Sequence, residues 1–155
     1  RAAAAGAAPG ATASVGAAAA ALVRTLEHLH ADRGLDIRSA VADPDVVRVQ
    51  REDLEEMLGN LLDNACKWTR TRVAVDSRAA GDQVEILVED DGPGVAPSML
   101  EQVLQRGVRA DEAAPGSGFG LAIVRDLADL YGGSITLENR PAGGLEARLR
   151  LPSAR

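Results

Sequence analysis

Two asparagines and a lysine share one edge of an otherwise apolar segment. The stretch NLLDNACKW places Asn60, Asn64 and Lys67 at spacing i, i+4, i+7, so on a helix they form one stripe beside the apolar face. An amide oxygen is a neutral ligand for a hard cation such as Mg²⁺ that already carries phosphates and water. A lysine one turn away supplies a point charge for a phosphate. The alternative is a half-exposed polar edge without a ligand, and this segment alone leaves both interpretations open.

An acidic turn, Asp90-Asp91-Gly92-Pro93-Gly94, directly follows an apolar strand pattern. Glycine and proline are ordinary loop residues, so a plain turn is one interpretation. The functional interpretation is that Asp90 accepts a hydrogen bond from an exocyclic amine, because an ionised carboxylate only accepts. Such a group favours adenine over guanine, and the glycines let a ring approach the backbone.

A second glycine-rich run, Gly116-Ser117-Gly118-Phe119-Gly120-Leu121, precedes a helical pattern. Glycines expose backbone N–H groups at the positive end of a helix, where phosphates bind. The spacing is GxGxG and no strand leads into it, which excludes the dinucleotide-binding fingerprint. A P-loop is also excluded, because Lys67 is the only lysine in the chain.

The elements that must position these residues mix helices with strands. Helical apolar spacing covers residues 17–33, 51–67 and 119–131, with a possible short helix over 99–105. Its apolar stripes are Ala21, Leu22, Leu26 and Leu29 in the first helix, and Phe119, Ile123, Leu127 and Leu130 in the third. Strand patterns cover residues 35–41, 46–50, 71–77, 83–90, 134–139 and 145–151. The mixture predicts an α+β fold: a two-layer sandwich with a mixed, mostly antiparallel sheet and helices on one face.

The bulk properties limit the organisation and the partners. The length of 155 residues suits one domain. Residues 1–16 are Ala- and Gly-rich and suggest a poorly ordered linker or the end of an upstream helical domain, and residues 17–155 the folded domain. This run lacks the large apolar residues of a membrane span or a signal peptide. A net charge of −6 argues against a nucleic-acid partner. The single Cys66 excludes an internal disulfide and favours a cytosolic setting.

The three motifs, in this order, resemble the ATP-binding domain shared by sensor histidine kinases, DNA gyrase, the large ATP-driven heat-shock chaperone and MutL. NLLDNACKW is similar to its asparagine box, DDGPG to its first glycine box and GSGFGLAIV to its second. The forms NLLDNA-x-K, EDDGPGV, RGVR and GFGLAIVRDLADLYGG resemble the histidine kinases, above all those of the PhoQ type. The resemblance covers about residues 17–151 and implies a Bergerat-type sandwich.

The resemblance also implies roles for individual residues. Asn64 is expected to be the principal Mg²⁺ ligand with Asn60 beside it, Lys67 to contact phosphate, and Asp90 to take the adenine amine. A mobile lid is expected over about 95–117. The remaining residues expected around the nucleotide are Trp68 against the adenine, Gly92, Gly94, Val95, Arg106, Arg109 near the terminal phosphates, Gly116, Ser117, Gly118, Phe119, Gly120 and Leu121.

As a reaction, the resemblance implies transfer of the γ-phosphoryl of Mg-ATP to a histidine on a separate dimerisation and phosphoacceptor domain, and from there to a response regulator. LEHLHADRG, around His28 and His30, lacks the acceptor pattern, so we expect the acceptor outside this chain. The phenylalanine-rich box before the lid is missing, and Ala114 stands where PhoQ-type relatives often have a basic residue. The fragment is expected to be a monomer, and the full protein a homodimer in the bacterial inner membrane with this domain in the cytoplasm.

Two other functions fit the same motifs. One is an ATP-gated conformational module or ATPase of the chaperone, gyrase and MutL type. Those proteins usually carry a catalytic Glu one helical turn before the Mg²⁺-binding Asn, and Asn60 stands there in this chain, which disfavours hydrolysis. The other is a degenerate binding module without activity, which the intact Asn64, Lys67, Asp90 and GSGFG disfavour.

Overall fold

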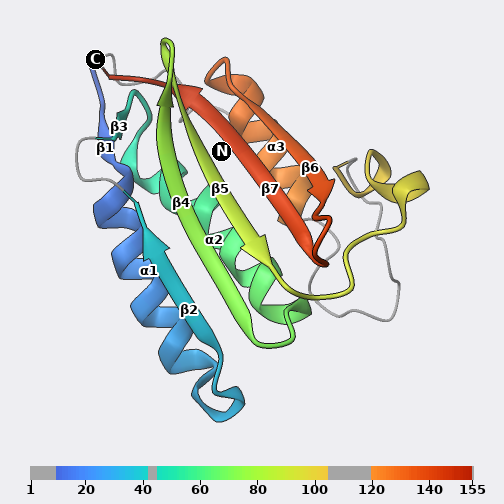
Figure 1. Ribbon diagram of the computed structural model, residues 1–155. Helices are drawn as coiled ribbons and strands as arrows, with labels where there is room; N and C mark the ends of the chain where they lie inside the picture. The colour runs from blue at the N-terminus through green and yellow to red at the C-terminus, as the bar shows by residue number, and fades with distance from the viewer. Residues whose placement is uncertain (1–9, 42–44, 105–119, 155) are drawn as a thin grey trace.

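The fold is a five-stranded sheet with three helices packed on one face (Figure 1). It is seen in a computed structural model that describes residues 10–41, 45–104 and 120–154. The helices are α1 (Val15–Leu29), α2 (Arg51–Trp68) and α3 (Gly120–Leu130). The sheet runs in the order β2 (Asp36–Ala40), β4 (Arg72–Ala80), β5 (Gln83–Asp90), β7 (Leu145–Pro152) and β6 (Ser134–Asn139). The pair β2–β4 is parallel and the other pairs of this sheet are antiparallel, so the predicted mixed sandwich is confirmed.

Helix α2 lies against the sheet and between the other two helices (Figure 1). Its inward side chains are fully or almost fully buried: Leu54, Met57, Leu58, Leu61 and Leu62. Full burial of one such aliphatic side chain stabilises the fold by about 1.5–3 kcal/mol. The apolar face that the sequence predicts for this helix is therefore confirmed, and Asn60 and Asn64 lie half-buried at its edge.

The predicted stripes of the other two helices are correct in part, since Leu26 and Leu127 are buried and Leu22 and Ile123 are packed against the core. Leu29 is 66% exposed and Leu130 is 50% exposed, so both were wrongly assigned to the core. Small side chains share the inward faces: Ala18 and Ala19 in α1, and Ala122 and Ala128 in α3. Small residues allow a closer approach of helix axes than leucines do, which is a physical reason for these helices to turn their alanines inward.

The outer face of the sheet is a surface of paired charges. The Glu85 carboxylate on β5 is 6% exposed and lies between Arg78 Nε at 2.8 Å and Arg150 Nε at 2.6 Å. These hydrogen bonds lower the pKa of Glu85 below its usual value. Arg148 and Glu146 form a further pair along β7. Because one face of the sheet carries these charged pairs, the apolar side chains of the strands gather on the other face, where the helices pack and form the core.

Three distant segments meet at one corner of the domain. β1 (Ala13–Ser14) pairs with β3 (Val46–Val47), and Val47 bridges to Ser153. Ser14 then caps α1, since its hydroxyl accepts a hydrogen bond from Ala17 N at 3.1 Å. The boundary drawn at residue 17 thus falls inside α1, and residues 13–16 belong to the folded part.

Three short elements differ from the sequence prediction. The strand expected over 46–50 is limited to β3. The helix expected over 99–105 is replaced, within the described residues, by two 3₁₀ helices, Pro97–Met99 and Gln102–Leu104. A third 3₁₀ helix, Ala31–Arg33, ends the region where a continuous helix to residue 33 was expected. Proline at 97 suits the first turn of such a helix, because it has no N–H to satisfy.

Candidate nucleotide site

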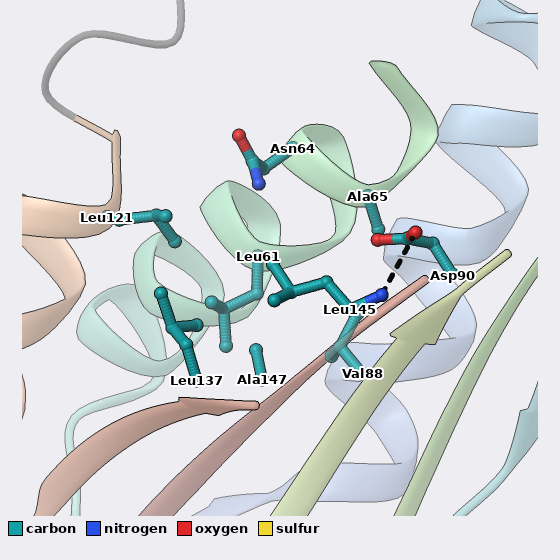
Figure 2. Close-up of a pocket in the computed structure, with 9 residues that line it drawn as sticks. All are labelled: Leu61, Asn64, Ala65, Val88, Asp90, Leu121, Leu137, Leu145 and Ala147. Carbon is teal, nitrogen blue, oxygen red and sulfur yellow. Dashed lines mark hydrogen bonds between the residues drawn. The ribbon is translucent and has the colours of Figure 1, made fainter. Parts of the chain in front are cut away.

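A hollow of about 230 Å³, part of it open to solvent, lies between α2, the start of α3 and the ends of β5, β6 and β7 (Figure 2). Asn64 and Asp90 are the polar side chains on its wall. The rest of the wall is apolar: Leu61, Ala65, Val88, Leu121, Leu137, Leu145 and Ala147. An apolar hollow with a few convergent polar groups is typical of small-molecule sites.

Asp90 ends β5 and is 4% exposed. Its Oδ1 accepts hydrogen bonds from Gly92 N at 2.8 Å and from Leu145 N at 3.4 Å, the second of which is drawn in Figure 2. Burial raises the pKa of Asp90 above its usual value, and the two backbone N–H groups oppose that rise. Its Oδ2 has no hydrogen-bond partner among the residues that the structure describes, so this oxygen can accept from a ligand.

The neighbouring Asp91 has a different role. Its Oδ1 lies 2.6 Å from Thr69 Oγ1 and accepts from the backbone N–H groups of Arg70, Thr71 and Arg72 at 2.9, 2.9 and 3.2 Å. Hydrogen bonds from Thr69 and Thr71 hold the pKa of Asp91 far below its usual range. Asp91 thereby ties the end of β5 to the loop that follows α2.

The first glycine box is shaped by close backbone contacts. A Cβ at Gly92 would lie 2.2 Å from the Trp68 carbonyl oxygen, a distance that Cβ atoms do not adopt. Gly94 has φ +77°, and a Cβ there would lie 2.5 Å from Asn139 Oδ1. Both positions therefore require glycine, one for space and one for space and conformation.

The two asparagines of α2 face different neighbours. Asn64 projects toward the hollow (Figure 2), and its amide makes no hydrogen bond within the described part of the chain. Asn60 donates from Nδ2 to Glu56 O at 2.8 Å, which leaves its oxygen near the first residue of α3. A Cβ on Gly120 would lie 3.2 Å from that oxygen. The asparagine edge thus lies beside the positive end of a helix, where anions are stabilised.

The described structure does not place every predicted residue on the wall of the hollow. Lys67 pairs with Asp63 at 3.2 Å, and its side chain is 34% exposed. Four further predicted residues are near the lining residues in the sequence but do not line the hollow: Trp68, Gly92, Gly94 and Val95. Arg106, Arg109, Gly116, Ser117, Gly118 and Phe119 lie outside the described residues, as does most of the lid expected over 95–117.

Sequence reasoning missed two residues that hold the site from behind. Asn139, the last residue of β6, donates from Nδ2 to Val95 O at 2.6 Å and accepts from Val95 N at 2.9 Å. Arg140 donates to Asp90 O at 3.0 Å. The sequence signal was slight, since Asn-Arg-Pro only indicates a turn.

A magnesium site built from protein carboxylates alone is absent from residues 10–41, 45–104 and 120–154, where no group of three or more His, Cys, Asp or Glu could hold an ion. The available donor set fits Mg²⁺ in another way. This ion usually keeps waters and phosphate oxygens and takes few protein ligands. The amide of Asn64, which lines the hollow and makes no hydrogen bond among the described residues, has the chemistry of such a ligand.

The sequence also matches the family model for histidine kinase-, DNA gyrase B-, and HSP90-like ATPases over residues 49–155. Among curated proteins, the chain is 50% identical over 102 residues to the sensor protein kinase CarS of Pseudomonas aeruginosa, with 66% of this chain and 23% of that protein covered. It is 37% identical over 124 residues to the virulence sensor histidine kinase PhoQ of Salmonella typhimurium, with 79% and 25% covered. The chain spans about a quarter of the length of these relatives.

Solved structures give the same relationship. The mycobacterial sensor histidine kinase MprB superposes with a TM-score of 0.81 at 27% identity, with 92% of this chain and 96% of that chain covered. Full-length ShkA in complex with AMPPNP gives 0.81 at 28% identity, with 92% and 31% covered. The chain belongs to the family of histidine kinase-, DNA gyrase B-, and HSP90-like ATPases, and within it to the ATP-binding catalytic domains of sensor histidine kinases.

Proposed function

We propose that this domain binds Mg-ATP in the hollow between α2 and the ends of β5 and β7, and transfers the γ-phosphoryl to a histidine on a separate dimerisation and phosphoacceptor domain. The observation that carries the proposal is that Asn64 and Asp90 line the same hollow. Among the described residues, the Asn64 amide and the Asp90 Oδ2 have no hydrogen-bond partner, so both can bind a ligand. The AMPPNP complex of the related ShkA supports nucleotide binding.

The hollow suits a purine at its Asp90 end. The Oδ2 of Asp90 offers an acceptor to an exocyclic amine, and the surrounding aliphatic side chains of Leu145, Val88 and Ala147 offer a dry wall to a ring. Guanine presents a carbonyl oxygen in the place of that amine, and two acceptors repel. The site should therefore select adenine.

The phosphates are assigned to the other end, beside Asn60, Asn64 and the N-terminus of α3. The backbone N–H groups of the first turn of α3 have no partner within the helix, and they point toward an anion placed there. We assign Asn64 as the principal protein ligand of Mg²⁺, with Asn60 beside it. When bound, the ion neutralises charge on the phosphate oxygens during transfer.

We also propose the roles that the family resemblance implies for the other residues: phosphate contact for Lys67, adenine contact for Trp68, and shaping of the pocket for the glycine boxes. Lys67 is one helical turn beyond Asn64 and can exchange its exposed pairing with Asp63 for a phosphate, since such surface pairs contribute at most about 1 kcal/mol. Arg109 remains the proposed cation at the terminal phosphates.

The partners and the location are proposals of the same kind. We propose a dimeric full protein in the bacterial inner membrane, with this domain in the cytoplasm and a response regulator as the final acceptor. None of the described helices is long and apolar enough to cross a bilayer. The gyrase and chaperone type of activity is not favoured, because Asn60 stands where those proteins usually carry the glutamate that activates water.

The decisive experiment supplies the acceptor separately. The chain is mixed with Mg-ATP labelled in the γ-phosphate and with the phosphoacceptor domain of a related kinase, and acid-labile phosphate is measured on that domain. Transfer that depends on Asn64 supports the proposal. Steady release of inorganic phosphate without transfer would instead indicate an ATPase, and failure to bind ATP would contradict both functions.

A further inference from the structure

The hairpin between β6 and β7 grips the end of β5 at several points. Two neighbouring residues of this hairpin, Asn139 and Arg140, reach the backbone of Asp90 and Val95. These contacts join residues 44 and 50 positions apart in the chain. Neither Asn139 nor Arg140 lines the hollow, and both contact backbone atoms. They can therefore position the Asp90 side chain without touching a ligand.

Arg140 is the contact nearest to Asp90. Its Nη1 donates to Asp90 O at 3.0 Å and lies 3.4 Å from Gly143 O, and its Nε lies 3.9 Å from Glu89 Oε1. The Arg140 side chain is 31% exposed, and its Nη1 reaches two backbone oxygens. A hydrogen bond from a charged donor is about twice as strong as a neutral one.

The hairpin backbone fits against the same carbonyl. A Cβ on Gly144 would lie 1.9 Å from Asp90 O, and Gly144 has φ +98°, so only glycine lets the hairpin come this close. Arg140 N donates to Gly144 O at 2.9 Å and closes the turn. One residue further on, Leu145 N donates to Asp90 Oδ1 at 3.4 Å. Both the carbonyl and the carboxylate of Asp90 are thus fixed from one hairpin.

This arrangement begins where the pairing of β5 with β7 ends. The register of β5 and β7 pairs Glu89 with Glu146 as its last partners. Asp90 therefore lies one residue past the β5–β7 pairing, although on the other side of β5 it is still in register with Val73 of β4. The side chain of Arg140 takes the place of the missing partner on the β7 side.

Asn139 holds the turn that follows. Its carboxamide bonds both the N–H and the C=O of Val95, at 2.9 and 2.6 Å, as a neighbouring strand would. At the start of the same turn, Gly92 N donates to Asp90 Oδ1. The turn from Asp90 to Val95 is therefore held at both ends. A free turn of this length would sample many conformations.

We propose that Arg140 is the positioning residue for the adenine-binding carboxylate of Asp90, and that Asn139 supports it by fixing the turn from Gly92 to Val95. Arg140 touches no nucleotide in this proposal. It sets the direction in which Asp90 Oδ2 faces the hollow, and so controls selection of a base that carries an amine. The inference rests on the proposed nucleotide function.

The test compares two ligands that differ at the amine. ADP carries it, and IDP has a carbonyl oxygen in its place. The variant Arg140→Met keeps the aliphatic stem and removes the donors. We expect ADP affinity, measured by calorimetry, to fall about tenfold, the effect of losing one charged hydrogen bond. IDP affinity should change less than about twofold, because IDP gains nothing from a well-placed acceptor.

Two further variants complete the design. Arg140→Lys, which keeps one charged donor, should restore at least half of the lost ADP affinity on a logarithmic scale. Arg38→Gln removes an exposed arginine that pairs with Asp36 on β2, far from the hollow in the sheet order, and should leave both ligands unchanged. If Arg140→Met does not fold, Arg140→Gln, whose shorter amide reaches fewer acceptors, gives the same comparison.

The outcomes separate the two claims. Binding of ADP by the unaltered chain, together with equal losses of ADP and IDP affinity in Arg140→Met, would show a merely structural role and overturn the inference while the proposed function stands. Unchanged ADP affinity would overturn it as well. Failure of the unaltered chain to bind ADP contradicts the proposed function, and the inference falls with it.

Discussion

Gly92 lies directly against the backbone carbonyl of Trp68. A Cβ at Gly92 would be 2.2 Å from that oxygen, so the glycine box after β5 and the last turn of α2 touch through backbone atoms. The end of α2 is itself held by Arg33, which donates to Cys66 O and Thr69 O. The two sequence motifs are therefore parts of one structural joint.

The contact predicts that Gly92→Ala moves this joint. The added methyl group cannot fit without a backbone shift, and such overpacking destabilises by about 1–3 kcal/mol. We expect a matching loss in urea unfolding and a weaker affinity for ADP. Gly59→Ala on α2 is the control, since its Cβ would lie at an ordinary 3.6 Å from Leu22 Cδ2 of α1. That variant should gain about 0.5–1 kcal/mol, and equal stability of the two variants would contradict the prediction.

Asp90→Asn should weaken binding of ADP by about tenfold or more. The Asp90 oxygen near Gly92 N and Leu145 N already accepts two hydrogen bonds, so the amide oxygen of Asn takes that place. Its NH₂ group is then turned toward the ligand, where an acceptor is needed. Asp82→Asn, at the exposed turn before β5, makes the same chemical change away from the hollow. Equal ADP affinity in the two variants, measured by calorimetry, would refute the role of Asp90.

Asn64→Ala should abolish the effect of Mg²⁺ on nucleotide affinity. Alanine is favourable within a helix, so the variant should fold, and a lost effect then reports the amide. Calorimetric titrations of ATP with Mg²⁺ and with excess chelator give the comparison. Gln83→Ala removes an amide from the far end of β5 and should keep the full magnesium dependence. A magnesium effect of normal size in Asn64→Ala would remove this residue from the proposed ion site.

Asp91 predicts a specific loss of stability in acid. Its pKa in the folded state is lowered from the ordinary 3.8 by hydrogen bonds from Thr69 and Thr71. A lowered pKa adds stability that is complete above the pKa of the unfolded state and is lost as the pH falls below it. The chain should therefore lose unfolding free energy from about pH 4 downward.

The variant Asp91→Asn isolates this contribution. It should be less stable at pH 7, because it loses charged hydrogen bonds to the loop after α2, and the gap to the unaltered chain should narrow as the pH falls below about 4. Urea unfolding at a series of pH values measures the gap. The lowered pKa of Glu85 is untouched in this variant, so some acid sensitivity should remain. A gap that stays constant with pH would show that Asp91 stabilises through shape alone.

The parts of the fold with strong periodicity could be predicted from sequence. The apolar face of α2 continues through most of the helix. Asn60 and Asn64 could be recognised as a polar edge because they lie beside this face and not within it. The strands β4 to β7 alternate clearly enough to show their hairpins. Asp90 and Asn64 were predicted as site residues and line the same hollow, although their ligand roles remain predictions.

Features that depend on distant contacts could not be predicted. The pairing of β1 with β3 involves two residues on each side, too few to show a period. The exposure of Leu29 and Leu130, at the last residues of α1 and α3, and the burial of the alanines depend on packing against neighbouring elements, which periodicity alone does not show. Asn139 and Arg140 bond Val95 and Asp90, which are more than 40 residues away in the chain. Nothing in the local sequence distinguishes these two residues from other turn residues.

The corner formed by β1, β3 and Ser153 is joined to the nucleotide hollow by two routes. It lies at the end of the β5–β7 pair where Gln83 meets Pro152, whereas the nucleotide hollow lies at the other end, by Asp90 and Leu145. The rise of a strand separates the two ends by roughly 20 Å. The corner is held by short pairings, two residues of β1 with two of β3 and one bridge from Val47 to Ser153, whereas β5 and β7 between the corner and the hollow are paired along seven residues. The corner is also joined to the hollow through the helices, because α1 begins there and packs against α2, which carries Asn64.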